Sequence, residues 1–584
     1  MTRFPPLLLA LALVGRPALA ADATNDFKAL LEESWEFQVR EDPLLASATG
    51  DARFDDRLPA VAPADFERRG EFWKRSQARL RSIDRTRLSE ADRVSYDMFA
   101  RNLEDEIAEV AFRTWRMPLN AEGSFHSDFA RLPSSLPLAT ARDYENYIAR
   151  LRAFPAYGRQ QIANMREGLR TGFTQPRVTL EGFEGTITTH LVANVETSVF
   201  WKPFASFPAT VPEADRGRLR AAGRAAIEGE VLPAFRALLQ FMQTEYLPKA
   251  RTSVGASELP EGRAYYEWRV RHFTTVRITP DEVHAKGLAE VARIRADMDA
   301  VLKQLHWTQG FPEFLKFLRT DPRFYAKSPE DLLKEASTIA KRMDGKLPSL
   351  FKTLPRQPYG VEPVPADIAP KYTAGRYNGA PIDSARSGTY WVNTYALETR
   401  PLYALEALTL HEAVPGHHLQ GALQQEQKDL PAFRRFGYVD AFGEGWGLYS
   451  EWLGQEVGFY QDPYSNFGRL TYEMWRACRL VVDTGLHAKG WTRDQALAYL
   501  ADNTALSIHE VTTETDRYIG WPGQALAYKM GELKIRELRK RAEAALGPRF
   551  DVRLFHDAVL KNGSVPLSVL DAQIDAFIAA APPR

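Results

Sequence analysis

The segment ETRPLYALEALTLHEAVPGHHLQGALQQEQ, residues 398–427, indicates a helix that carries a histidine and a glutamate at its end. Its leucines recur at short intervals that approximate one face of an α-helix. This stripe consists of Leu402, Leu405, Leu408 and Leu410. We therefore expect His411 and Glu412 to lie on a helix with one buried face.

The motif HEAVPGHH, residues 411–418, starts like the zinc-peptidase signature His-Glu-x-x-His but has Pro415 at its fifth position. In the usual signature the two histidines lie one turn apart on one helix face, and the glutamate acts as general base. On an undistorted helix His417 would lie about 9 Å from His411 along the axis, and His418 about 10.5 Å. On such a helix neither His417 nor His418 would be placed well to share a metal ion with His411.

Pro415 prevents the helix from continuing undisturbed. It has no N–H to donate to the carbonyl of residue 411, and its ring clashes with that carbonyl. Gly416 tolerates unusual backbone dihedral angles. We predict that residues 413–416 loop out and that His417 takes the place of the missing histidine, with His418 as the alternative ligand.

A third zinc ligand is expected in VDAFGEGWGLYSEWLGQEVG, residues 439–458. Glu444 lies there in a helical pattern rich in glycine, tryptophan and leucine, and a carboxylate in apolar surroundings needs a cation. The alternative is that Glu444 caps a helix or forms an ordinary ion pair. We expect Glu451 and Glu456 to be solvated.

Helical periodicity dominates the rest of the chain, and strand signals are few. Apolar residues three and four positions apart predict helices at 27–41, 89–115, 279–305 and 531–546. Strands are predicted at 177–180 (RVTL), 263–270 (RAYYEWRV) and 389–395 (TYWVNTY). Ser89 and Thr279 each precede an acid by three residues, which is typical of a helix N-terminus. The sequence therefore predicts a mainly α fold with a small β-sheet. We expect a helical N-terminal part at 21–354 and a catalytic part at 355–584, with a boundary that is not sharply marked.

Composition and the N-terminus restrict the possible partners. The chain has 584 residues, and its 75 Lys plus Arg balance its 75 Asp plus Glu. With no net charge, neither nucleic acid nor an anionic membrane surface is favoured as a partner. Residues 1–20 resemble a secretory signal peptide that ends in Ala18-Leu19-Ala20, so we expect export to the periplasm and no membrane insertion after cleavage. Cys478 is the only cysteine, so we expect neither an internal disulfide nor a lipid anchor at the cleavage site.

Five long motifs in the C-terminal half form a distinctive set. They are HEAVPGHHLQ (411–420), FGEGWGLYSEWLG (442–454), RLVVDTGLHAKGW (479–491), ETDRYIGWPGQALAYKMGELKIRELR (514–539) and FDVRLFHDAVLKNGSVPLSVL (550–570). Together they resemble the bacterial family known as domain of unknown function 885. Members are regarded as zinc metallopeptidases, distantly similar to helical channel-type peptidases such as thimet oligopeptidase and angiotensin-converting enzyme. The resemblance implies a large helical protein that encloses a cleft or channel, with the small sheet beside the zinc helix.

The resemblance also implies one zinc ion bound by His411, His417 and Glu444, with Glu412 as general base. The base accepts a proton from a water molecule that the metal activates and passes it to the leaving amine of a short peptide. Because of the inserted Pro-Gly step, the resemblance does not decide whether His417 or His418 is the second histidine ligand.

The charge that develops on the scissile carbonyl oxygen needs a further hydrogen-bond donor. Channel-type peptidases supply a tyrosine or histidine from a C-terminal segment, so the candidates are Tyr518 and Tyr528, with His487 less favoured. The two tyrosines could instead be packed core residues, and His487 could simply form a hydrogen bond with Asp483 one turn away. Arg517 could bind a substrate carboxylate, but we expect it to pair with Glu514.

Three functions are consistent with these residues. A zinc peptidase that acts on short peptides is favoured. A metal-dependent hydrolase of another amide or ester would use the same chemistry, and a non-catalytic binding protein would keep the fold, although the intact Glu412 argues against it. The strand at 389–395 precedes the zinc helix and could present an edge to an extended peptide or pack internally under that helix.

Overall fold

Helices make up most of the chain in the computed structural model, which describes residues 16–119, 124–366, 368–380 and 387–580. The mainly α fold with one small sheet is confirmed. Most of the predicted signal peptide, residues 1–15, lies outside the described residues. No helix among the described residues is both long enough and apolar enough to cross a membrane.

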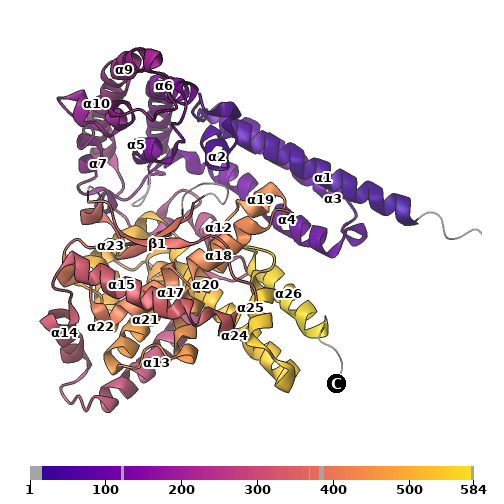
Figure 1. The fold of residues 1–584 in the computed structure, drawn as a ribbon, viewed down its shortest axis with the longest axis vertical. Helices are drawn as coiled ribbons and strands as arrows, with labels where there is room; N and C mark the ends of the chain where they lie inside the picture. Colours follow the sequence, from indigo (N-terminus) through magenta and orange to yellow (C-terminus); the bar gives the residue numbers. More distant parts are fainter. Residues whose placement is uncertain (1–15, 120–123, 367, 381–386, 581–584) are drawn as a thin grey trace, which may run out of the picture.

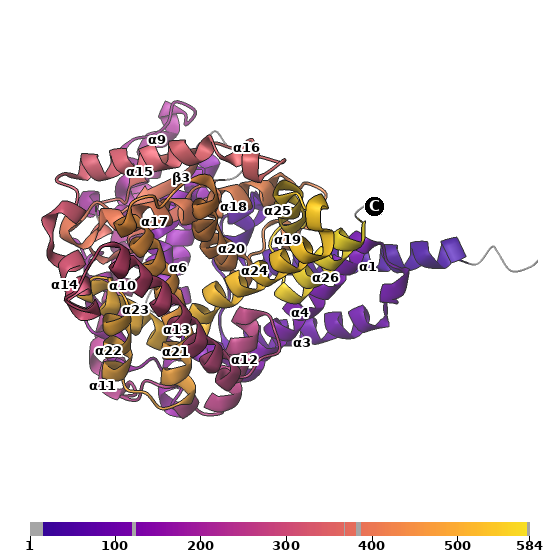
Figure 2. The same ribbon diagram turned by 90° about the horizontal axis from the view of Figure 1, so that it is seen from below.

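An N-terminal arm projects from the rest of the molecule (Figures 1 and 2). It consists of α1 (Arg16–Glu41), α2 (Pro43–Ala48), α3 (Pro63–Ser82) and α4 (Glu90–Phe112). As predicted, Ser89 caps α4: its hydroxyl accepts a hydrogen bond from the Asp92 amide at 3.1 Å. The arm has its own core, to which Phe433 from the C-terminal part also contributes.

A second group of helices has a separate hydrophobic core. Its members are α5 (Phe125–Ser135), α6 (Ala141–Thr171), α7 (Glu184–Thr188), α8 (Lys202–Ala205), α9 (Glu213–Ala226), α10 (Leu232–Phe241) and α11 (Leu247–Lys249). In Figure 1 this group lies above the sheet and the helices that follow it.

The remaining helices surround the largest core, whose side chains come mainly from residues 294–574, and a smaller cluster that contains buried residues of the first of these helices. They are α12 (Gly262–Thr274), α13 (Pro280–Gln304), α14 (Phe311–Thr320), α15 (Pro329–Asp344), α16 (Leu347–Leu350), α17 (Leu405–Glu412), α18 (His417–Glu426), α19 (Ala432–Arg435), α20 (Asp440–Leu453), α21 (Pro463–Ala488), α22 (Arg493–Asn503), α23 (Ile508–Gly520), α24 (Ala527–Leu546), α25 (Val552–Leu560) and α26 (Leu567–Ala580). The predicted capping box at Thr279 and Glu282 starts α13. Because α13 packs along α21, this core includes helices from both sides of residue 355.

The sheet has the strand order β1-β3-β2, formed by β1 (Tyr359–Pro363), β2 (Gly375–Asn378) and β3 (Gly388–Val392). β3 pairs in parallel with β1 and antiparallel with β2, and α17 contacts β2. The strand predicted at 389–395 therefore exists as β3, but both of its edges are paired. Of the two alternatives for this strand, β3 is internal, and the free edge is wrong, because the edge beside α17 belongs to β2.

The other two predicted strands are wrong. Residues 177–180 form a 3₁₀ turn, and residues 263–270 lie within α12. The aromatic and β-branched residues of α12 suggested a strand, but Tyr265, Tyr266 and Trp268 are buried against neighbouring helices. Tertiary packing outweighs strand propensity there.

Candidate metal centre

The helix that carries the candidate ligands is interrupted between α17 and α18. The Ala413 amide still donates to the Thr409 carbonyl at 2.9 Å, but the Gly416 amide donates to the Leu410 carbonyl at 3.0 Å and closes a wider turn. A Cβ on Gly416 would lie 1.9 Å from the His411 carbonyl oxygen. Only glycine therefore fits where the chain crosses back over its own helix, and residues 413–416 leave the helix as expected.

This interruption brings His417 beside His411, with the two imidazole rings 4.7 Å apart between centroids. Oε2 of Glu444, on α20, lies 3.6 Å from Nε2 of His411 and 3.4 Å from Nε2 of His417. Three ligands of a tetrahedral zinc ion, each about 2.1 Å from it, would lie about 3.3–3.6 Å apart. The distances from Glu444 to the two imidazoles match this spacing, and the three candidate ligand atoms all lie within 4.8 Å of one another.

Glu451 fixes the orientation of the His411 ring from behind. Its Oε1 lies 2.7 Å from Nδ1 of His411, and both side chains are buried. Because a carboxylate accepts, the neutral ring would hold its proton on Nδ1 and direct the lone pair of Nε2 toward the other two ligands. The expectation that Glu451 is solvated is wrong, whereas Glu456 is exposed.

Glycine at position 447 leaves room for the same ring. A Cβ there would lie 2.7 Å from Nε2 and Cε1 of His411. Two residues earlier, α20 also approaches α24 closely, since a Cβ on Gly445 would lie 2.5 Å from the Cα of Gly531. This contact between helices places Tyr528, at the start of α24, near the ligands.

The charges of the ligand set are strongly coupled. Burial alone would lower the pKa of His411, but the carboxylates of Glu444 and Glu451 outweigh burial and raise this pKa to about 9. Burial likewise opposes ionisation of Glu444, but the two imidazoles hold its pKa well below its usual value. The site therefore favours a cation among its ligands, either protons or a metal ion.

His418 does not join this group. Its Nδ1 lies 3.0 Å from the hydroxyl of Tyr377, and its ring packs 4.7 Å from that of Tyr359. Burial lowers its pKa to about 4, so the ring is neutral near pH 7. Of the two histidines left open by the sequence, the structure brings His417 to the other ligands and directs His418 toward the sheet.

Glu412 is held at the edge of the sheet. The Tyr377 amide of β2 donates to Oε2 of Glu412 at 2.8 Å. Glu412 and the three candidate ligands line one cavity of about 430 Å³, which fits the expected cleft. The carboxylate therefore faces the same space as the ligands without belonging to their set.

The cavity also contains tyrosines that could donate to a developing negative charge. The Tyr528 ring lies 6.4 Å from the His411 ring, and Tyr528 lines the cavity. Tyr438 lines it too, with its hydroxyl close to Gly443. Tyr438 was not predicted from the sequence, because it lies in the loop before α20, where no periodic pattern marks it.

Tyr518 and His487 are placed elsewhere. The hydroxyl of Tyr518 accepts hydrogen bonds from Trp475 and Arg479, both at 2.8 Å, and Tyr518 is not among the cavity-lining residues. His487 accepts from the Ala256 amide and donates to the Tyr518 carbonyl, each at 3.0 Å. Burial lowers the pKa of His487 to about 3. Both residues serve as packed core groups.

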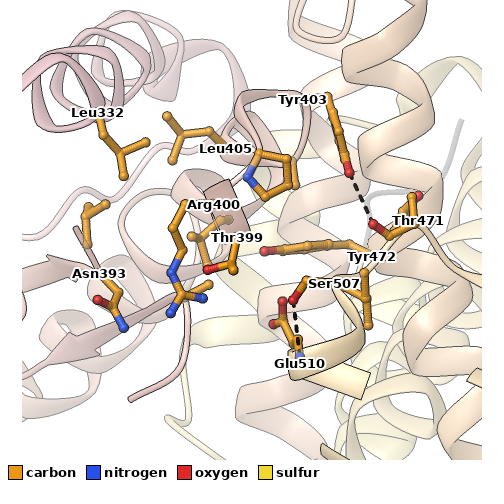
Figure 3. Close-up of a pocket in the computed structure, with 17 residues that line it drawn as sticks. Leu332, Asn393, Thr399, Arg400, Tyr403, Leu405, Thr471, Tyr472, Ser507 and Glu510 are labelled. Atoms are coloured by element: carbon orange, nitrogen blue, oxygen red, sulfur yellow. Dashed lines mark hydrogen bonds between the residues drawn. The ribbon is translucent and has the colours of Figure 1, made fainter. Parts of the chain in front are cut away.

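A smaller cavity of about 30 Å³ adjoins the main one (Figure 3). The two cavities share Ala374, Leu408, Tyr472 and Glu510 in their walls. Figure 3 shows Arg400, Tyr472 and Glu510 among the side chains that line this smaller cavity. The main cavity therefore has a narrow side pocket beside α21 and α23.

Comparisons with known proteins identify relatives without a described activity. A family model described as "Bacterial protein of unknown function (DUF885)" matches residues 43–574. A crystal structure of a "putative lipoprotein" from Colwellia psychrerythraea shares 29% identity and superposes with a TM-score of 0.89, covering 95% of this chain and 99% of that one. A "putative lipoprotein of unknown function" from Shewanella oneidensis shares 19% identity and the fold, with a TM-score of 0.72 over 94% of this chain and 99% of that one. No curated protein matches the sequence significantly.

Proposed function

This chain belongs to the DUF885 family of bacterial proteins, and we propose that it is a zinc-dependent peptidase that hydrolyses short peptides. The observation that carries the proposal is the spacing of His411, His417 and Glu444 around one point, with Glu412 beside them in the same cavity. Two imidazoles and one carboxylate are the protein ligands of several catalytic zinc sites, which keep a further position for water or substrate.

The donor set fits zinc better than the hard cations. Magnesium and calcium prefer oxygen ligands, whereas imidazole nitrogen suits zinc and other transition metals. The contact between Glu451 and His411 supports the same assignment, because metal-binding histidines usually donate their second N–H to a carboxylate or carbonyl group. A zinc ion held there would supply a Lewis acid that activates water and polarises the scissile carbonyl group.

Side chains of the protein carry out the proton transfers and stabilise the negative charge that develops. Glu412, positioned by the Tyr377 amide, accepts a proton from the attacking water and returns it to the amine as the C–N bond breaks. The products are then one carboxylic acid and one amine. The hydroxyl of Tyr528 or Tyr438 donates to the carbonyl oxygen as negative charge develops on it.

Strand β2 supports a peptide as the substrate. It is an edge strand of the sheet, and Gly375, Arg376 and Tyr377 line the cavity. An extended peptide could pair with this edge and lie across the metal ligands. Export is part of the proposal, supported by the signal-like residues 1–20 and by the lipoprotein descriptions of the two solved relatives.

The proposal is tested by measuring the metal content of the purified protein together with the cleavage of a mixed peptide library. We expect one zinc ion per chain and cleavage of short peptides. Glu412→Gln should abolish cleavage and retain zinc, because the base is not a ligand, whereas Glu398→Gln at an exposed position should change neither. Absence of stoichiometric metal would overturn the proposal. Bound zinc without any peptide cleavage would favour a hydrolase of another amide or ester.

A further inference from the structure

One wall of the main cavity is lined by three buried arginines. Arg476 and Arg479 lie one turn apart on α21, and Arg517 lies on α23. Their exposed fractions are only 4%, 2% and 5%. Arginine is costly to bury without anionic partners, so the contacts of these side chains indicate whether the protein alone neutralises them.

Arg517 is paired within the protein. Its guanidinium group lies 3.3 Å from the Glu514 carboxylate, as expected from the sequence, and donates to Gln524 at 2.7 Å. Glu514 also accepts from Arg479 at 2.9 Å. One carboxylate is therefore shared by two guanidinium groups.

Arg476 and Arg479 keep unused donors. Nη1 of Arg479 and Nε of Arg476 have no hydrogen-bond partner among the described residues. The nearest carboxylate oxygen to Arg476 belongs to Glu451, at 3.5 Å, which is too long for a good hydrogen bond. Since Glu451 is already engaged by His411, it neutralises Arg476 only in part.

Glu510 is the other acidic residue on this side of the cavity. Burial raises the pKa of its carboxyl group to about 7, despite the positive charge of Arg400, so it carries only part of a negative charge near neutral pH. The three buried guanidinium groups thus share the carboxylate of Glu514, part of the charge of Glu451 and the partly protonated carboxyl group of Glu510. This side of the cavity therefore lacks about one negative charge, and an anionic group bound in the cavity would supply it.

The distance from this wall to the metal ligands limits where such a charge would lie on a substrate. The Arg479 guanidinium stacks 4.3 Å from the Tyr528 ring, which lies 6.4 Å from the His411 ring. The distance from the Arg479 guanidinium group to the centre of the His411 ring is therefore at most the sum of these two distances. This span corresponds to at most about three residues of extended peptide.

We propose that Arg476 and Arg479 bind the C-terminal carboxylate of the peptide substrate, so that cleavage occurs within about three residues of its C-terminus. The inference rests on the proposed peptidase function. Paired guanidinium groups suit a terminal carboxylate, because each offers several N–H donors in a fixed planar arrangement. The small side pocket next to Tyr472 lies on the same side of the cavity and would leave little room for a bulky terminal side chain.

The first experiment leaves the protein unchanged. Two peptides of identical sequence, one with a free C-terminal carboxylate and one with a C-terminal amide, are compared with the zinc-loaded protein. Loss of charge-assisted hydrogen bonds should lower kcat/KM for the amide by about 10- to 100-fold, and mass spectrometry should find cleavage only near the C-terminus of the free acid. Equal cleavage of both peptides would overturn the carboxylate site and leave the peptidase function standing. Failure to cleave any peptide would overturn both.

Variants then test the two arginines. Arg476→Gln and Arg479→Gln should raise KM for the free acid by about 10-fold or more and remove the preference over the amide, with zinc content retained. Arg493→Gln is the matched control, because Arg493 pairs with Asp516 outside the cavity. Circular dichroism shows whether each variant is folded. A folded variant pair that keeps the full preference for the free acid would show that other groups bind the carboxylate.

Discussion

Replacement of Glu451 by glutamine tests whether the buried carboxylate behind His411 supports a metal site. Glutamine has nearly the same volume, and its amide oxygen can still accept from Nδ1 of His411, which is 2.7 Å from Glu451 Oε1. The substitution therefore removes one negative charge and leaves the packing of α20 almost unchanged. Because Oε2 of Glu451 has no partner among the described residues, no other hydrogen bond is lost.

The expected magnitude follows from the position of that charge. The carboxylate raises the electron density on the imidazole, fixes its tautomer and faces Arg476 at 3.5 Å. Loss of such a partner lowers metal affinity by about 10- to 100-fold, which corresponds to about 1.4–2.7 kcal/mol of binding free energy. Burial is nearly complete, so solvent does not screen the interaction.

The assay is a competition titration of zinc between the protein and a chromophoric chelator at fixed pH. Glu456→Gln is the control, since Glu456 pairs with Arg539 at 2.8 Å in an exposed position and should leave the zinc affinity unchanged. An unchanged affinity for Glu451→Gln, beside an unchanged control, would refute the idea that His411 is a metal ligand oriented by Glu451.

Three further predictions concern the ligand set. Glu444→Ala should lower zinc occupancy and activity together, measured by metal analysis of the purified variant; full occupancy would disqualify Glu444 as a ligand. His417→Ala should strip the metal while His418→Ala spares it, and the reverse pattern would exchange their roles. Gly447→Ala would place a methyl group 2.7 Å from the ligand nitrogen of His411, so we expect about 1–3 kcal/mol of lost stability in urea unfolding and weaker zinc binding; wild-type values for both would contradict the close contact.

Much of the fold was predictable because local signals and packing agree. The helices around Ser89 and Thr279 form with the predicted caps, since a capping side chain and an apolar stripe act over a few residues. The strand predicted at 263–270 failed because its buried aromatic residues pack equally well on a helix, and only their distant neighbours select between the two.

Some residues of the candidate site were likewise predictable from the sequence, and others were not. The sequence alone brought together His411, Glu412, His417 and Glu444 as candidates, because Pro415 rules out an undisturbed helix and the motifs are specific.

Tertiary structure alone decided the remaining assignments. It placed Glu451 behind His411, brought Tyr528 but not Tyr518 to the cavity, and made β2 rather than the strand at 389–395 the edge beside Glu412. The physical reason is that a carboxylate, a tyrosine or a strand edge acquires its role from groups far away in the chain. Local sequence patterns do not indicate which of those distant groups will lie nearby in the fold.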